Sequence, residues 1–147
     1  MLYQTNEDVL RLVTAFENCT LPCAEWTHAA HFTVGMWYVI HHSSEEALRI
    51  MRDGINRYNP HCGAPTASDI PRERGYHETL TALYIKAIER FCAENDPNMP
   101  IYALAHALCE SQYAAKDFPL RHYSKEVLFS SEARYSYVPP DKSPLPM

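Results

Sequence analysis

The stretch LPCAEWTHAAHFTVGMWYVIHH, from Leu21 to His42, decides the fold. On a helix its apolar residues cover most of the circumference: Trp26, Ala29, Ala30, Phe32, Val34, Met36, Trp37, Val39 and Ile40. A helix that is apolar all round is normally a buried one. Pro22 suits a first helical turn, and a helix of about 20 residues spans roughly 30 Å, the width of a small domain. We therefore predict a buried central helix over Pro22–His42.

Helical patterns also occur on both sides of this stretch. Thr5 is a plausible N-cap for a helix that ends near Asn18, and Ser43 with Glu46 forms a capping-box pattern for a third helix. Apolar residues recur at helical spacing in residues 76–94 and 101–113. No strand-like alternation appears. The sequence therefore predicts an all-α single domain, residues 1–147, with about five helices around the central one.

The C-terminal tail, residues 116–147, is rich in proline. One or two short helices fit around Ser124–Phe129 and Ser131–Tyr135. We expect the rest of the tail to wrap over the bundle as an irregular segment.

Composition excludes several classes of protein. The net charge is −5 and no Lys or Arg cluster marks one face, so nucleic-acid binding is not expected. Glu25, His28 and His31 make the apolar stretch a poor membrane span, and the N-terminus lacks a secretory pattern. We therefore expect a cytoplasmic protein. Aromatic-rich buried helices also occur in dimer cores, which favours a homodimer.

The chain has five cysteines, an odd number, without a C-x-x-C pair. This pattern favours reduced thiols over a disulfide framework. Cys19 and Cys23 are four residues apart and could contact a metal, but free cysteine is commonly a small buried hydrophobe.

The apolar stretch contains three ionisable residues at positions i, i+3 and i+6: Glu25, His28 and His31. Buried ionisable groups are costly unless they are paired, hydrogen-bonded or bound to a metal. Neighbours in this series lie about 60° apart around a helix and can share a ligand, whereas all three on one ion would be strained.

A second histidine-bearing block, His77-Glu78, begins the helical pattern of residues 76–94. The economical hypothesis is one divalent transition metal (Zn, Fe, Ni or Mn) bound by His28, His31 and His77, with Glu25 as fourth ligand or orienting group. Such a site keeps positions open for water, which is typical of catalysis. Glu78 and Tyr76 are then the candidates for general acid or base.

The sequence thus predicts a metal-dependent enzyme acting on a small molecule, with hydrolysis and oxidation both open. The alternative is a non-catalytic helical module that binds a ligand or a protein, its core histidines held by hydrogen bonds. A structural metal is a third possibility. His106 and Glu110 form an i, i+4 pair that we interpret as a surface contact.

Residues 59–75, NPHCGAPTASDIPRERG, interrupt the helical pattern with proline and glycine. Loops of this length are often functional. Two interpretations stay open, a surface crossing and a lid or wall over a site.

Three segments carry a resemblance: EWTHAAHF (25–32), GYHETLT (75–81) and YSKEVLFSSEARYSYVPPD (123–141). Together they resemble the signature blocks of a family of small bacterial helical proteins that is itself uncharacterised. The resemblance implies that the two histidine blocks and the Ser131–Arg134 block belong to one signature. It makes Arg134 a candidate for anchoring Glu25, Glu78 or an anionic substrate. The other interpretation is an ion pair that fixes the tail.

Overall fold

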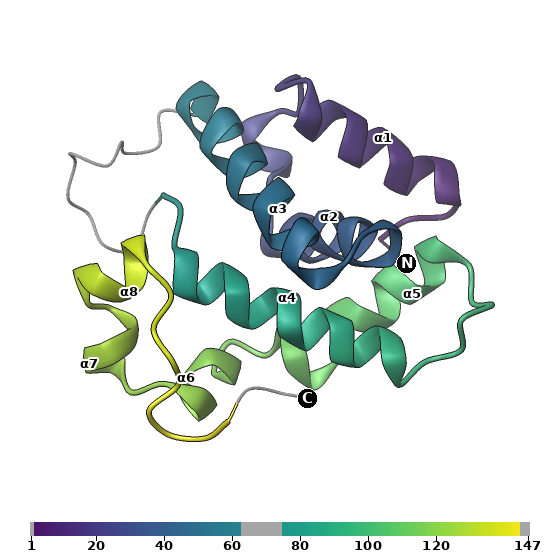
Figure 1. Cartoon of the computed structure of the whole chain (residues 1–147). Helices are drawn as coiled ribbons and strands as arrows, with labels where there is room; N and C mark the ends of the chain where they lie inside the picture. Colours follow the sequence, from purple (N-terminus) through teal and green to yellow (C-terminus); the bar gives the residue numbers. More distant parts are fainter. Residues whose placement is uncertain (1, 63–74, 145–147) are drawn as a thin grey trace.

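The computed structural model describes residues 2–62 and 75–144, and helices are the regular structure throughout these ranges. Five longer helices build the body of the protein (Figure 1). They are α1 (Asn6–Glu17), α2 (His28–His41), α3 (Ser44–Tyr58), α4 (Glu78–Ala93) and α5 (Ile101–Cys109). This confirms the predicted all-α bundle.

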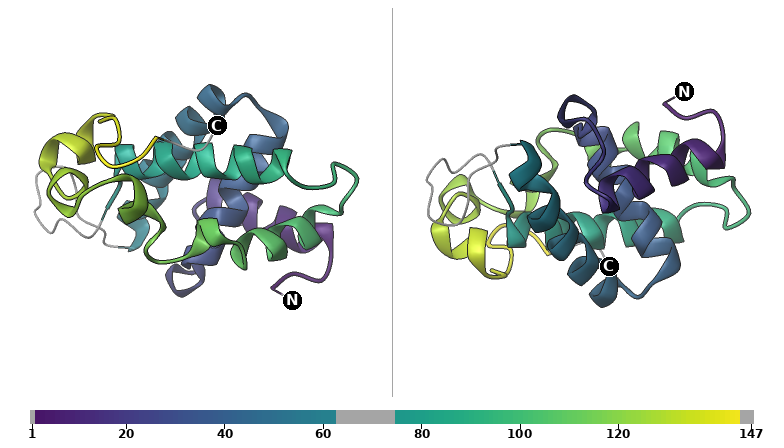
Figure 2. Two further views of the ribbon diagram at one scale, coloured as in Figure 1. Left: turned by 90° about the horizontal axis from the view of Figure 1, so that it is seen from below. Right: turned by 90° about the horizontal axis from the view of Figure 1, so that it is seen from above.

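The middle of the bundle is α2, which packs against α1, α3, α4 and α5. Its buried residues lie on all sides of the helix: Ala30, Phe32, Thr33, Val34, Gly35, Met36 and Tyr38. Figure 1 shows α1, α3, α4 and α5 around it, and Figure 2 gives the same arrangement seen from below and from above. The prediction of a buried central helix is therefore confirmed.

The predicted start of this helix at Pro22 is wrong by six residues. Residues Cys23–Glu25 form a separate 3₁₀ helix, η1, and α2 begins at His28 after the N-cap Thr27. The Thr27 hydroxyl accepts a hydrogen bond from the N–H of Ala30 at 3.1 Å. Because threonine satisfies an unpaired N–H at a helix start, the helix begins here. Glu25 consequently does not share a helix with His28 and His31.

Two hydrophobic cores lie on opposite sides of α2. Phe32 and Met36 contribute to a core with α4, α5 and the C-terminal segment. Val34 and Tyr38 contribute to a second core with α1 and α3. A helix that feeds two cores must be apolar on two faces, which explains the apolar pattern of its sequence.

Short helices follow α5. They are η3 (Gln112–Ala114), α6 (Phe118–His122), α7 (Lys125–Leu128) and α8 (Ser131–Tyr135). The two predicted tail helices are confirmed as α7 and α8, whereas α6 was not predicted. Beyond α8 the chain returns across α4, where the hydroxyl of Thr79 donates to the carbonyl of Ser136 at 2.9 Å.

One disulfide joins Cys23 in η1 to Cys62 at the end of the 3₁₀ helix η2 (Asn59–Cys62). The prediction that all cysteines are reduced is wrong for this pair, because α3 folds back and brings its C-terminal end beside η1. Cys19, Cys92 and Cys109 are free thiols.

Within residues 2–62 and 75–144, no helix is long and apolar enough to cross a membrane.

Candidate functional site

A cavity of about 430 Å³ lies between α2, α3 and α4 and contains most of the histidines singled out from the sequence. His28, His31, Tyr76 and His77 all line it. Its other described lining residues are Trp26, Phe32, Gly35, Met51, Ile55, Asn59, Gly75, Leu80, Thr81, Tyr84, Ile85 and Ile88. We refer to it as the histidine pocket. The volume is within the usual range for small-molecule sites.

Aromatic rings form much of its wall. The indole of Trp26 stacks on Phe16 of α1 with centroids 4.5 Å apart, and it also stacks on the His31 ring at 3.8 Å. Phe32 and Tyr84 meet edge to face at 4.9 Å. Stacked and edge-to-face pairs fix ring orientations, so this wall is rigid. The Trp26 Nε1 atom is buried without a hydrogen-bond partner in the described structure.

His31 is held in a defined orientation by its own helix. Its Nδ1 lies 2.7 Å from the carbonyl oxygen of Thr27, and because a carbonyl only accepts, Nδ1 carries the proton. Burial lowers the pKa of His31 below its usual 6.5. The imidazole is therefore neutral at pH 7.

His28 lies one turn earlier, at an exposed position of the same pocket. Its ring meets Phe32 edge to face at 4.7 Å. Burial lowers the pKa of His28, and an interaction with the backbone of Ala114 opposes this shift only in part. Burial likewise raises the pKa of Tyr84 to about 12, so both groups are uncharged at pH 7.

Both ring nitrogens of His77 are in hydrogen bonds. Nε2–H donates to the carbonyl of Leu128 at 2.7 Å, and Nδ1 accepts from the N–H of Leu80 at 3.0 Å. His77 is thus the N-cap of α4 and the anchor of α7. Burial lowers its pKa. Metal binding by His77 would require one of these hydrogen bonds to break.

The two predicted acid–base candidates form one network beside the pocket. The Tyr76 hydroxyl donates to Glu78 at 2.6 Å, and Arg52 of α3 binds both oxygens of the same carboxylate at 2.8 Å. Arg52 holds the pKa of Glu78 below its usual value, whereas burial raises that of Tyr76. Glu78 is consequently a paired carboxylate that positions Tyr76, and it does not line the pocket.

Arg134 reaches the same region from α8. Its guanidinium donates to the backbone carbonyl of Tyr76 at 3.1 Å. Of the carboxylates suggested for it, Glu78 is bound by Arg52 and Glu25 lies in a different groove. The contact to Tyr76 therefore joins the tail to the wall of the pocket.

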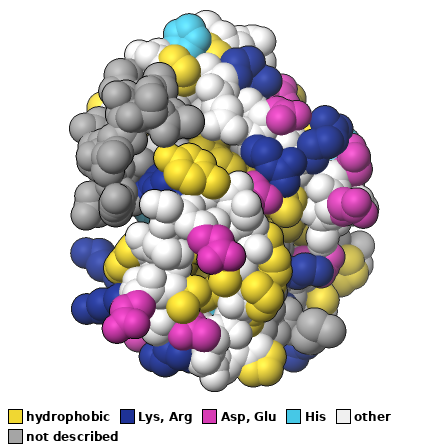
Figure 3. Space-filling view, turned by 60° about the vertical axis from the view of Figure 1, so that its left-hand side comes forward, with side chains coloured by type: hydrophobic (Ala, Val, Ile, Leu, Met, Phe, Trp, Pro, Cys, Tyr) yellow, Lys and Arg dark blue, Asp and Glu magenta, His cyan; other side chains and the backbone are white. Residues whose placement is uncertain are grey.

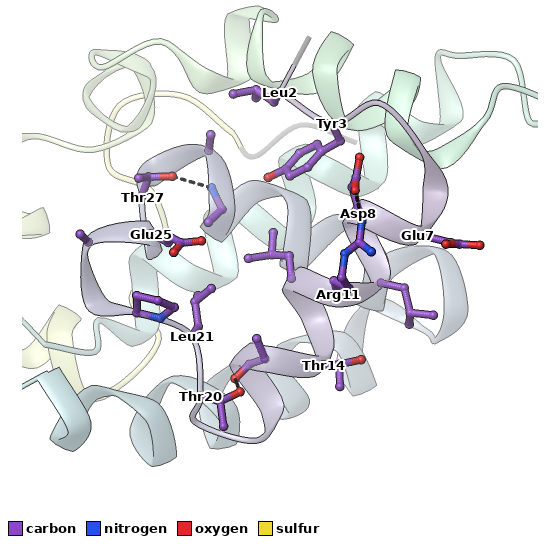
Figure 4. Close-up of a pocket in the computed structure, with 17 residues that line it drawn as sticks. Leu2, Tyr3, Glu7, Asp8, Arg11, Thr14, Thr20, Leu21, Glu25 and Thr27 are labelled. Atoms are coloured by element: carbon purple, nitrogen blue, oxygen red, sulfur yellow. Dashed lines mark hydrogen bonds and ion pairs between the residues drawn. The ribbon is translucent and has the colours of Figure 1, made fainter.

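Glu25 lines an open groove between α1 and the segment that precedes α2 (Figure 4). Glu25 and Thr27 lie on one side of this groove, and Asp8, paired with Arg11, lies on the other. The start of α2 at His28 is the reason for this separation. Glu25 is thus not beside the histidine pocket, contrary to the predicted ligand set.

The structure therefore brings His28, His31 and His77 to one pocket but does not form the predicted four-ligand centre. In the described part of the chain, no group of three or more His, Cys, Asp and Glu side chains is placed to hold a metal. A metal ion stays a prediction.

Sequence reasoning missed several parts of the site. The apolar pattern indicates core positions for Trp26, Phe32 and Tyr84. Trp26 nevertheless lies between two predicted metal ligands, Glu25 and His28. Arg52 and the Leu128 carbonyl gave no local signal, because they reach the site from distant parts of the chain. Residues 63–74 of the loop at 59–75, interpreted as either a surface crossing or a lid or wall over a site, lie outside the described residues.

His106 and Glu110 form the predicted i, i+4 contact, with Nε2 2.7 Å from the carboxylate.

On the face shown in Figure 3, Lys and Arg side chains are interspersed with Asp and Glu.

No protein-family model matches the chain, and no curated protein or solved structure is significantly similar to it. The family resemblance of the three sequence blocks thus stays a prediction.

Proposed function

We propose that this protein binds an uncharged, mainly apolar small molecule in the histidine pocket. The observation that carries the proposal is the lining: none of its described residues is Asp, Glu, Lys or Arg. A charged ligand would lose its hydration there without gaining a counter-ion from these residues, which costs several kcal/mol or more. An apolar ligand gains about 25 cal/mol for each Å² removed from water.

The histidines support a binding role over acid–base chemistry. His31 and His77 each use ring nitrogens to hold the local backbone, and Glu78 is neutralised by Arg52. The described walls of the site are thus fixed and uncharged, which is typical of a pocket formed before its ligand arrives. Binding of this kind corresponds to the non-catalytic alternative stated from the sequence, with the histidine pocket as the proposed binding site.

The test is a ligand screen by thermal shift, followed by calorimetry of each hit. We expect uncharged aromatic compounds to bind with one-to-one stoichiometry and their carboxylated analogues to bind at least tenfold more weakly. Leu80→Trp should fill the pocket and abolish binding, whereas the matched Leu10→Trp, in the groove of Figure 4, should leave it intact. Binding that survives Leu80→Trp in a folded protein, or hits restricted to charged compounds, would overturn the proposal.

We propose a metal-dependent reaction as a second candidate, because His28 and His31 line the same pocket. Two imidazoles would leave positions for a substrate or water on the ion. Titration of apo protein with Zn, Fe, Ni or Mn checks this. His28→Ala and His31→Ala should abolish stoichiometric metal binding while His77→Ala retains it. Failure of every metal to bind removes this candidate.

A further inference from the structure

The hydrogen-bonding groups of the histidine pocket indicate what kind of uncharged ligand it takes, on the basis of the function proposed above. Most polar groups of its wall already have partners. The Tyr76 hydroxyl donates to Glu78, the Thr81 hydroxyl donates to the His77 carbonyl at 2.7 Å, and both nitrogens of His77 are in use. The polar atoms of the wall that lack a partner therefore determine which ligand groups the pocket can bind.

His31 keeps one nitrogen for a ligand. Nδ1–H is committed to the Thr27 carbonyl, so Nε2 of the neutral ring has a lone pair and no proton. Among the described residues, no hydrogen bond is made by Nε2. This nitrogen is an acceptor that cannot become a donor without protonation of the ring.

The other polar side chains of the lining set no such preference. His28 and Asn59 line the pocket as well, and an imidazole or an amide can both donate and accept. The hydroxyl of Tyr84 makes no hydrogen bond in the described structure and can donate or accept, as a hydroxyl does. Trp26 Nε1 is buried against its neighbours and is closed to a ligand. The atom with a fixed hydrogen-bonding role is therefore the acceptor His31 Nε2, which belongs to a wall made largely of aromatic rings.

We infer that the ligand is an uncharged planar aromatic molecule with an N–H or O–H donor, of the indole, azole or phenol class, that donates to His31 Nε2. A ring of this kind can pack against Phe32 and Tyr84, which line the same pocket, and aromatic pairs favour such contacts. The ligand's donor satisfies the ring nitrogen of His31 that the bond to Thr27 leaves as an acceptor.

The experiment compares indole with 1-methylindole, and phenol with anisole, in nuclear magnetic resonance titrations of the whole chain. The Trp26 side-chain N–H signal reports occupancy of the pocket, and Trp37 is the internal reference. We expect the compound with the donor to bind about fivefold to tenfold more tightly, because a neutral hydrogen bond contributes on the order of that factor.

His31→Phe should remove this preference while retaining binding of the methylated compounds. His41→Phe is a matched control. His41 lies on the same helix, with Nδ1 2.7 Å from the Trp37 carbonyl and its ring 4.2 Å from the Trp37 ring, outside the pocket. We expect the His41 variant to keep the wild-type preference.

Equal affinity for donor and methylated compounds in the wild-type protein would overturn this inference and leave the proposed function standing. A preference that persists in His31→Phe would overturn the role of Nε2. If neither member of either pair shifts the Trp26 signal, this inference fails, and the thermal-shift screen decides the proposed function separately. The comparison within the wild-type protein does not depend on the folding of a variant.

Discussion

His77 shows how a single residue can resemble a metal ligand in sequence and act as a connector in structure. Its ring caps α4 through Leu80 and holds α7 through Leu128, 51 residues further along the chain. The sequence placed this histidine at the start of an apolar helical pattern, and the structure buries it, with 8% exposed. The partner could not be predicted, because a backbone carbonyl has no residue-specific signature.

The variant His77→Ala should therefore reduce stability. Loss of the cap costs about 1 kcal/mol, and the unpaired Leu128 carbonyl costs about 1–3 kcal/mol more. We expect the free energy of unfolding in urea to fall by about 2–4 kcal/mol. His42→Ala, at an exposed position, is the control and should change it by less than about 0.5 kcal/mol. A small effect of His77→Ala would contradict the double role.

The three pocket histidines also predict how stability depends on pH. The folded-state pKa values of His28, His31 and His77 all lie below the usual 6.5, so the unfolded chain binds more protons below that pH. Their contribution is complete above about pH 6.5 and is lost as the pH falls through the folded-state pKa values. Urea unfolding between about pH 7.5 and about pH 5 should show decreasing stability. His31→Phe should reduce the slope.

At the scale of elements, the boundaries of α2 show the limit of periodicity. The apolar pattern continues from Leu21, yet Thr27 interrupts it as a cap, and Trp26 turns away to stack on Phe16 of α1. The pattern predicted burial correctly for α2 but not for η1, whose residues Cys23–Glu25 are exposed, and it did not predict the break between them. The threonine was the local signal that would have placed the start at His28.

Gly54 of α3 is a second element-scale feature, one that sequence reasoning did not single out. A Cβ at this position would lie 2.8 Å and 2.9 Å from two ring atoms of Phe16, which is fully buried and stacked on Trp26. The ring therefore has little room to move. The absence of a side chain allows α3 to approach α1 closely.

Gly54→Ala should destabilise the protein by about 1–2 kcal/mol, because overpacking outweighs the gain of about 1 kcal/mol in helix propensity. Thermal unfolding measures the effect. Asp53→Ala, the exposed neighbour on the same helix, is the matched control and should change little. An unchanged or higher midpoint for Gly54→Ala would show that Phe16 moves aside at no cost.

At the scale of the whole molecule, the sequence predicted the helical class, the central helix and the two small tail helices. These features depend on the local apolar periodicity of the sequence and on residues that cap helices. It did not predict the place of Glu25, which depends on where α2 begins. It also did not predict the Arg52–Glu78 pair or the Cys23–Cys62 disulfide, which depend on how α3 folds back on α2. The candidate site was thus predicted as a set of histidines, and its aromatic, uncharged wall was not.

The disulfide makes a prediction of its own. It closes a loop with a sequence separation of 39, for which chain entropy gives a stabilisation of about 4 kcal/mol. Cys23→Ser and Cys62→Ser should each lower the free energy of unfolding by a similar amount. The double variant should be no worse than either single variant, because all three lack the same bond. Additive losses would contradict the pairing.

That disulfide also closes α2 and α3 into one covalent ring. The junction of the two helices, at His42 and Ser43, is exposed. A protease that cut the backbone there would leave both fragments joined, so the nicked protein would migrate as a single band in electrophoresis without reductant. Addition of a thiol would release two fragments. A full-length mass measured without reductant would therefore not show that the backbone of this protein is intact.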